Sequence, residues 1–93
     1  MIKVIIERHI ADELGEHYEK AAKATLQKAM QAHGFISGEA LRDFDDHNHR
    51  IVIANYRTIN DWQLWLGSVE RKEMMEQIRP MLDREEKFTI LEH

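Results

Sequence analysis

Two short runs of β-branched residues constrain the fold of this chain more than any other feature of its sequence. Residues 4–6 (Val-Ile-Ile) form the first run, and residues 51–54 (Ile-Val-Ile-Ala) form the second. Because successive side chains of a strand point to opposite faces of a sheet, each run is apolar on both faces. Strands of this kind are typical of sheets that are buried on both faces. The sequence therefore predicts a sheet that needs a cover on each side.

Helical periodicity and turn residues place the other elements around these two runs. Leu14, Tyr18 and Leu26 recur at helical spacing, and the acidic segment 43–50 is typical of a turn between two strands. The expected elements, in chain order, are a strand over 2–6, a helix over 13–33, strands over 35–41 and 50–57, helices over 61–66 and 68–79, and a strand over 86–91.

Capping residues set the expected ends of the helices. Asp12 is expected to be the N-cap or a first-turn acid of the first helix, and Gly34 the glycine that follows its last turn. Asn60 is expected to cap the second helix and Ser68 the third. Pro80 is expected to end the third helix.

The order strand, helix, strand, strand, helix pair, strand is the βαββαβ pattern of a ferredoxin-like α+β fold, with a four-stranded antiparallel sheet. At 93 residues, the chain is predicted to be one domain over 1–93. Its helices can cover only one face of the sheet. A second copy of the chain is the simplest cover for the other face, so we expect a homodimer that packs sheet against sheet.

Composition excludes several classes of protein. Lys and Arg number 13 against 17 Asp and Glu, and the net charge of −4 argues against nucleic acid as a partner. The absence of cysteine excludes disulfides, thiolate metal sites and a cysteine nucleophile. No apolar run is long enough to span a membrane, and residues 1–6 do not form a secretory signal, so we expect a cytoplasmic protein.

Three segments of the chain carry a family resemblance. They are Gly-Phe-Ile-Ser-Gly-Glu-Ala-Leu-Arg-Asp at 34–43, Asp-Trp-Gln-Leu-Trp-Leu-Gly-Ser-Val-Glu-Arg at 61–71, and Ile-Arg-Pro-Met-Leu at 78–82. Together they resemble the antibiotic biosynthesis monooxygenase (ABM) domain family, and the resemblance covers nearly the whole chain. The second segment contains the pattern W-x-x-W-x-x-S-x-x-R. The resemblance implies a dimeric ferredoxin-like fold. Some members of the family oxidise quinol-like or polyketide aromatics with no metal or flavin, and others bind and degrade haem.

The resemblance makes a cofactor-independent monooxygenase the leading hypothesis, with a small aromatic or quinol-like molecule and O₂ as substrates and no metal or other cofactor. Such an enzyme needs an apolar pocket, hydrogen bonds to a developing oxyanion, and a base. We expect the pocket between the sheet and the helices, with Trp65 as one wall. The expected catalytic residues are Trp65, His33 and His9, and the expected substrate-binding residues are Trp62, Tyr56, Asn55 and Arg57.

Two alternatives stay open at this point. A non-enzymatic dimer that binds a small apolar ligand fits the sequence equally well, because no unmistakable catalytic group stands out. Trp62 and Trp65 also form an apolar stripe with Leu66 that is typical of core packing. A haem-degrading relative fits less well. In that branch an axial histidine lies ten residues beyond the tryptophan, where this chain has Met75, and an asparagine lies near the position of Arg8.

Three remaining features receive structural interpretations. The segment 45–49 (Asp-Asp-His-Asn-His) has the composition of a metal site, but turn chemistry explains it and we expect no metal. Arg71 is expected to form a structural salt bridge or to cap a helix. Residues 91–93 (Leu-Glu-His) also begin a common histidine-tag sequence, so we assign them no function and expect the last strand to end near Ile90.

Overall fold

The structure is a computed structural model that describes residues 1–93. The elements along the chain are β1 (Ile2–His9), α1 (Gly15–Ala29), β2 (Phe35–Arg42), β3 (His49–Tyr56), α2 (Ile59–Leu66), α3 (Val69–Ile78), a short 3₁₀ turn (Arg79–Met81) and β4 (Lys87–Glu92). This order is the βαββαβ pattern that the sequence predicts, with the second helical unit divided into α2 and α3. No helix combines the length and the apolar character that crossing a membrane requires.

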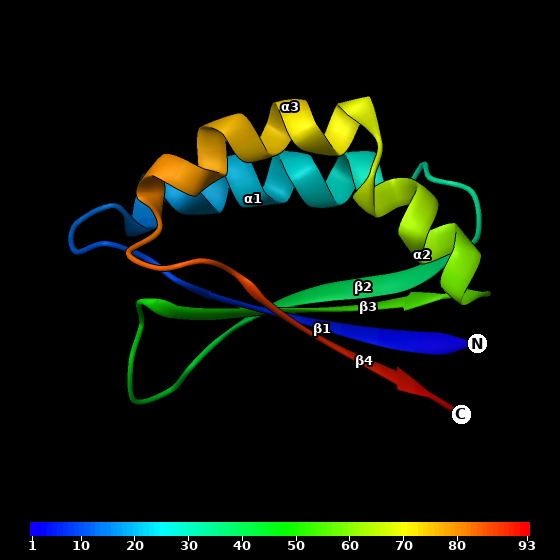
Figure 1. Cartoon of the computed structure of the whole chain (residues 1–93). Coiled ribbons are helices and arrows are strands. Elements are labelled where there is room, and N and C mark those ends of the chain that lie inside the picture. Colours follow the sequence, from blue (N-terminus) through cyan, green and yellow to red (C-terminus); the bar gives the residue numbers. More distant parts are fainter.

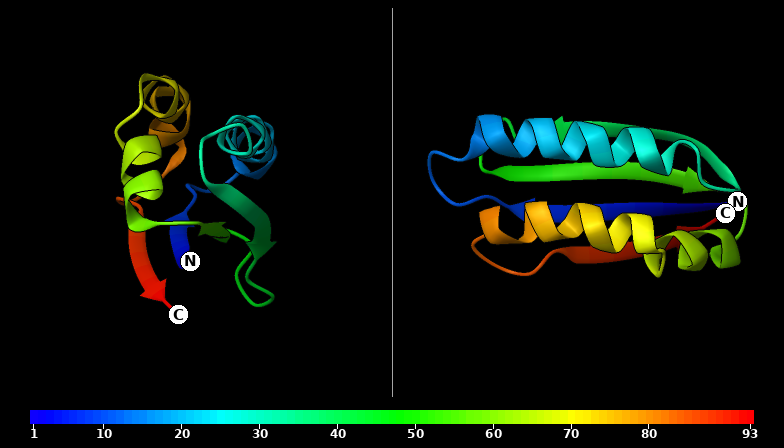
Figure 2. Two further views of the ribbon diagram at one scale, coloured as in Figure 1. Left: turned by 90° about the vertical axis from the view of Figure 1, so that its right-hand side faces the viewer. Right: turned by 90° about the horizontal axis from the view of Figure 1, so that it is seen from above.

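The four strands form one antiparallel sheet in the order β2-β3-β1-β4. The helices α1 and α3 lie side by side on one face of this sheet, and α2 lies at one end of it (Figures 1 and 2). The two β-branched runs, residues 4–6 and 51–54, lie in the central strands β1 and β3, and these strands pair along their whole length. The ferredoxin-like α+β fold is therefore confirmed.

The core lies between the sheet and the two long helices. Side chains of β1 alternate between buried and half-buried along the whole strand, which is the period of two that a strand requires. Val4 and Ile6 point to the helix layer, where Trp62 and Tyr56 each keep only 1% of their surface exposed. Burial of each such side chain stabilises the fold by about 1.5–3 kcal/mol.

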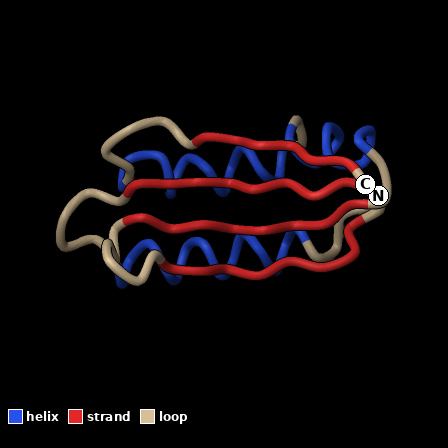
Figure 3. The backbone as a smooth tube through the Cα atoms, turned by 90° about the horizontal axis from the view of Figure 1, so that it is seen from below, coloured by secondary structure: helices blue, strands red, loops and turns tan.

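The other face of the sheet has no cover within one chain. Figure 3 shows the four strands from below with all helices behind them. Ile5, Ile51 and Ile53 on the central strands are half-buried, while Leu41 and Leu91 on the edge strands are 45% and 47% exposed. Nothing within one chain covers this face of the sheet, and the homodimer that would cover it stays a prediction.

Two of the four cap predictions were wrong. Thr58, not Asn60, caps α2, because its hydroxyl oxygen accepts the backbone N–H of Asp61 at 3.1 Å. Asp12 lies outside α1, which begins at Gly15, because Glu13 takes a left-handed backbone conformation (φ 70°) that interrupts the helix. The Asp12 carboxylate instead accepts a hydrogen bond from the amide of Asn48 at 2.8 Å.

The other end positions are closer to expectation. Ser68 caps α3 as predicted, since its Oγ accepts the backbone N–H of Arg71 at 3.2 Å. The chain leaves the helical conformation before Gly34, which lies in the turn after α1 with φ 80°. The last strand runs past Ile90 to Glu92, which pairs with Ile2. The sequence-based prediction ends this strand near Ile90 because residues 91–93 resemble the start of a histidine-tag sequence, and the structure shows that Leu91 and Glu92 nevertheless pair with β1.

Candidate functional site

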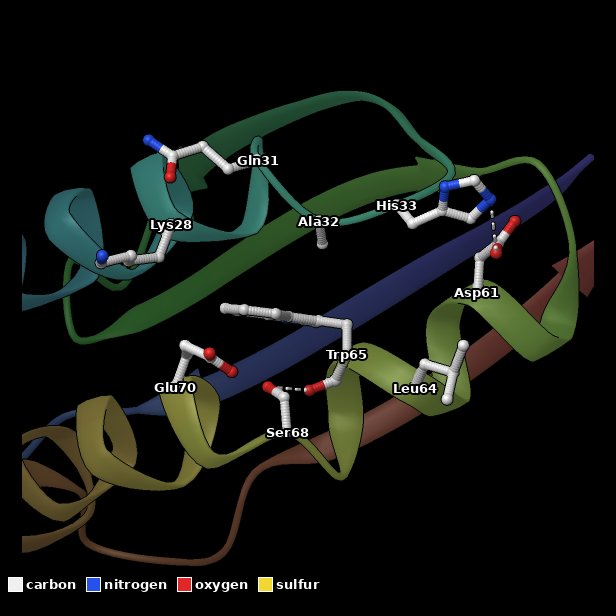
Figure 4. Close-up of a pocket in the computed structure, with 9 residues that line it drawn as sticks. All are labelled: Lys28, Gln31, Ala32, His33, Asp61, Leu64, Trp65, Ser68 and Glu70. Carbon is white, nitrogen blue, oxygen red and sulfur yellow. Dashed lines mark hydrogen bonds and ion pairs between the residues drawn. The ribbon is translucent and has the colours of Figure 1, made fainter.

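A pocket of about 340 Å³ opens between the C-terminal end of α1 and the corner where α2 meets α3 (Figure 4). Its lining residues are Lys28, Gln31, Ala32, His33, Asp61, Leu64, Trp65, Ser68 and Glu70. This volume lies near the lower end of the range of about 300–1,000 Å³ that small-molecule sites occupy. The pocket is therefore large enough for a small aromatic molecule.

The indole of Trp65 forms the floor of this pocket. Trp65 lies in the last turn of α2 and is 7% exposed, and Figure 4 shows its ring extending into the gap between α1 and α3. The Ser68 hydroxyl donates to the carbonyl oxygen of Trp65 at 2.7 Å, which fixes the α2–α3 corner. A rigid indole gives an aromatic ligand a flat surface on which to stack.

His33 and Asp61 form one wall of the pocket. Nε2 of His33 lies 3.8 Å from Oδ1 of Asp61, and the imidazole is 81% exposed while the carboxylate is 11% exposed. The Thr58 hydroxyl donates to Oδ2 of Asp61 at 3.0 Å and holds the carboxylate in place. A fixed carboxylate therefore faces an exposed imidazole across this wall, and the imidazole is the candidate general base of the pocket.

Gly34 allows this wall to close. Its φ of 80° is a conformation that side-chain-bearing residues rarely adopt, and a Cβ at this position would lie 2.1 Å from Oδ2 of Asp61. The carbonyl oxygen of Gly34 also accepts the backbone N–H of Arg57 at 2.8 Å, which ties the loop to the end of β3. The loop that carries His33 is therefore pressed directly against the Asp61 side chain.

Charged side chains flank the indole on two sides. Lys28 projects from α1 on one side and Glu70 from α3 on the other, and both are exposed (Figure 4). An ammonium group near the pocket attracts a ligand oxygen that carries negative charge. The pocket thus combines an aromatic floor and an imidazole with one cation, Lys28, and two carboxylates, Asp61 and Glu70.

Of the seven site residues predicted from the sequence, the structure brings Trp65 and His33 together. Asp61 was missed, although it lies in the segment that carries the family resemblance. Its sequence signal is the spacing Thr58-x-x-Asp61 at the start of a helix, which places an acid over the first turn. Its approach to His33 joins two elements far apart in the chain, so no local pattern reports it.

Trp62 and Tyr56 lie in the core beside the pocket, not in it. Their rings are 5.5 Å apart, and the ring of Trp62 meets that of Phe88 at 5.6 Å. Burial raises the pKa of Tyr56 to about 12, against an opposing effect of Arg71, so its phenol stays neutral. Trp62 and Tyr56 line a void of about 30 Å³, so the part of the space between sheet and helices that lies beside these two rings is nearly filled.

The other three predicted residues lie elsewhere. Asn55 is on the open face of the sheet, where its amide donates to the Ser37 hydroxyl at 3.0 Å. His9 ends β1, at the opposite end of the sheet from α2, and stacks on His49 with ring centroids 4.5 Å apart. Arg57 is exposed just beyond β3.

His49 is tied to two carboxylates that leave it no free ring nitrogen. Nδ1 lies 2.9 Å from Asp43 and Nε2 lies 3.2 Å from Glu7. The hydrogen bond that the His49 ring donates to the Asp43 carboxylate raises the pKa of His49 and lowers the pKa of Asp43. No group of three histidine or acidic side chains converges as a metal site would require.

A buried ionic layer lies beneath α3. Glu86 accepts from Arg8 at 2.9 Å and from Arg71 at 2.6 Å, and the prediction that Arg71 forms a structural salt bridge is confirmed. Burial alone would raise the pKa of Glu86, but the two guanidinium groups outweigh it and lower that pKa. The Met75 sulfur lies in this layer, 3.8 Å from Arg8, with 1% of the residue exposed.

The structure is thus a ferredoxin-like α+β domain with a small pocket whose floor is the indole ring of Trp65. Residues 1–77 match the family described as antibiotic biosynthesis monooxygenase, and the chain therefore belongs to that family. A comparison with curated proteins finds no match.

Solved structures with this fold include three that the chain matches almost end to end. A crystal structure of an antibiotic biosynthesis monooxygenase has a TM-score of 0.91 at 14% identity, covering 100% of this chain and 98% of that one. SnoaB from Streptomyces nogalater, a cofactor-independent oxygenase, has a TM-score of 0.86 at 14% identity, covering 99% and 92%. A conserved protein from Methanosarcina mazei has a TM-score of 0.89 at 15% identity, covering 96% and 88%. At these identities the likeness establishes the fold alone.

Proposed function

We propose that this protein is a cofactor-independent monooxygenase that oxidises a small phenolic or quinol-like aromatic in the Trp65 pocket. The observation that carries the proposal is the convergence of Trp65, His33 and Asp61 on one pocket in a chain of the ABM family. SnoaB, which shares the fold, is described as a cofactor-independent oxygenase. The pocket volume also suits a molecule of this size.

The proposed chemistry uses the substrate as its own electron source. Proton loss to His33 converts the phenol to a phenolate, which transfers one electron to O₂. The phenoxyl radical and superoxide then combine at the carbon para to the oxygen and, with the proton returned from His33, give a hydroperoxide. Loss of water from this carbon, which gives up its hydrogen as a proton, leaves a para-quinone. The sum is one phenol and one O₂ consumed, with one quinone and one water formed.

Each pocket residue has a role in this scheme. The Trp65 indole stacks on the ring and positions it. Asp61 is a positioning residue that stabilises the imidazolium of His33, and the Lys28 ammonium stabilises negative charge on the phenolate or on superoxide. Leu64 and Ala32 supply apolar surface beside the ring.

Oxygen uptake by the metal-free, flavin-free protein tests this proposal against a panel of naphthols and dihydroxynaphthalenes that carry hydrogen at the position para to a hydroxyl group, as the scheme requires. We expect uptake above the autoxidation background for at least one compound, and a loss of about tenfold or more in kcat/KM for Trp65→Ala and for His33→Gln. His17→Gln is the matched control, because His17 is another exposed histidine, on α1 but outside the pocket. Absence of uptake across the panel, or equal losses in the control, would count against the proposal.

We also propose that the protein is a homodimer that packs through the open face of its sheet. Support comes from the half-buried Ile5, Ile51 and Ile53 at the centre of that face, which no helix covers (Figure 3). Apolar surface of this extent on a sheet is typical of an interface. In such a dimer the Trp65 pocket stays accessible, because it opens on the helix side of the sheet (Figure 4).

A further inference from the structure

A second hollow lies on the helix side of the sheet and shares no residue with the Trp65 pocket. It has a volume of about 420 Å³ and lies between α1 and the strands β2 and β3. Seven of its eleven lining residues are hydrophobic, and two of these, Leu41 and Ile51, occupy strand positions whose side chains point to the open face. We call it the α1–β2 groove. Its volume falls within the range of small-molecule sites, about 300–1,000 Å³.

The floor of the α1–β2 groove is apolar, and it is open because the helices leave the edge of the sheet uncovered there. Ala22 and Leu26 come from α1, Val52 comes from β3, and Ala40 faces the helix layer from the edge strand β2. Ala40 is exposed, so α1 does not reach across β2 at this point. At Gly38, two residues before Ala40, the Leu26 side chain lies within 3.1 Å of the position that an added Cβ would take, so α1 packs closely over β2 there.

Cationic side chains dominate the rim of this groove. Arg50 is fixed, since its guanidinium donates to Glu19 at 2.9 Å and lies 5.7 Å from the centre of the Tyr18 ring. Lys23 and Arg42 are exposed and form no ion pair or side-chain hydrogen bond. With Glu19 as the single acid, the rim carries an excess of two positive charges in a chain whose net charge is −4. A local field opposite to that of the whole molecule favours an anionic ligand.

We propose that the α1–β2 groove binds an amphipathic organic anion, with its apolar chain on the Ala22–Leu26–Ala40 floor and its carboxylate at Arg42 and Lys23. The apolar floor disfavours inorganic phosphate and sugar phosphates, which have no hydrophobic part. A neutral apolar molecule leaves the two free cations without a partner. The proposal is independent of the oxygenase reaction, because the two sites share no residue.

Calorimetric titration with octanoate tests the proposal on the intact protein, with 1-octanol as the uncharged probe of equal chain length. We expect saturable binding of one octanoate per chain, and binding of octanol weaker by about tenfold. Arg42→Gln is expected to weaken octanoate binding about fivefold to tenfold. Ala40→Phe is expected to abolish binding, because the phenyl ring would fill the floor of the groove. Arg42 and Ala40 are both exposed, so both variants should fold.

Two controls separate this site from charge effects and from the Trp65 pocket. Lys87→Gln removes an exposed cation on the open face of β4, away from the groove, and should leave the affinity within about twofold. Trp65→Ala should also leave it unchanged. Absence of saturable binding, equal affinity for octanol, or weakening in Lys87→Gln equal to that in Arg42→Gln would overturn the proposal, as would a loss of octanoate binding in Trp65→Ala.

Discussion

At the scale of single residues, the contact between Gly34 and Asp61 decides how the candidate active site closes. The loop after α1 meets the first turn of α2 there, and a Cβ atom at Gly34 would clash with the Asp61 side chain. The loop after α1 brings His33 to the pocket only because Gly34 adopts a left-handed conformation against the carboxylate. The site therefore depends on a glycine that lines no part of the pocket.

Gly34→Ala tests this dependence. An alanine at φ 80° is strained by about 1–2 kcal/mol, and its methyl group must also displace Asp61. We expect a loss of about 2 kcal/mol or more in the free energy of unfolding, measured by urea denaturation. Gly67→Ala is the matched control, because its nearest contact to an added Cβ is 3.6 Å, and it should change stability by less than about 0.5 kcal/mol. Equal effects would refute the close-approach argument.

At the scale of elements, the start of α2 links helix capping to the pocket. Thr58 satisfies a backbone N–H of the first turn, and its hydroxyl also holds Asp61. One residue thus fixes both the helix end and the carboxylate that faces His33.

Thr58→Ala should therefore destabilise the protein by about 1 kcal/mol, the usual effect of losing an N-cap. Asn60→Ala is the informative comparison, because Asn60 is an equally good cap by residue type but does not cap α2 in the structure. Its expected effect is below about 0.5 kcal/mol. Thermal unfolding of the two variants decides the matter, and a larger loss in Asn60→Ala would contradict the assignment.

The caps also show how far the sequence alone could predict the elements. The order and type of the helices and strands followed from apolar patterns together with turn and cap residues, because both signals are local in the sequence. The edge strand β2 has no alternating buried face, and the turn segment 43–50 marks its end. Which of Thr58 and Asn60 caps α2 could not be predicted in this way. Both residue types are common caps, and the one that is used depends on where the preceding strand ends. Asp12 failed for a similar reason, because the left-handed conformation of Glu13 has no local signal.

The same distinction applies to the site. Trp65 could be predicted because the family resemblance marks the segment that carries it, and His33 because it is a histidine at the end of the predicted first helix. The role of Asp61 could not, since it depends on a contact between the loop after α1 and the first turn of α2. Asn55 shows a further limit, because a strand residue one position from Tyr56 must point to the opposite face.

At the scale of the whole molecule, the layer formed by Arg8, Glu86 and Arg71 joins β1, α3 and the connection to β4. Its one carboxylate serves two buried cations. Loss of that carboxylate leaves both guanidinium groups without their partner inside the protein, which is among the more costly changes a fold can suffer.

Glu86→Gln should accordingly destabilise the protein by about 3 kcal/mol at neutral pH. Because the pKa of Glu86 is lowered on folding, its contribution is fully present above the unfolded value of 4.5 and is lost as pH falls through the folded value. Urea unfolding of wild type and variant should therefore give free energies that converge in acid. A difference that stays constant down to about pH 2 would contradict this account.

The open face of the sheet makes a further prediction at this scale. Ile53→Lys places a charge at the centre of the proposed sheet-to-sheet interface, so sedimentation should show a dimer for wild type and a monomer for the variant. Val69→Lys is the control, because Val69 is 65% exposed on α3, on the helix side of the molecule. A wild-type monomer at micromolar concentration would refute the proposed dimer.

The location of aromatic binding tests the central claim most directly. Titration of ¹⁵N-labelled protein with a dihydroxynaphthalene should shift the backbone amide signals of His33, Asp61 and Ser68 and the indole N–H signal of Trp65 along one saturable curve. The amide of Asn55, on the opposite face of the sheet, should not move. Shifts centred on Asn55 or His9, or no saturable shift at all, would contradict the assignment of the Trp65 pocket as the substrate site.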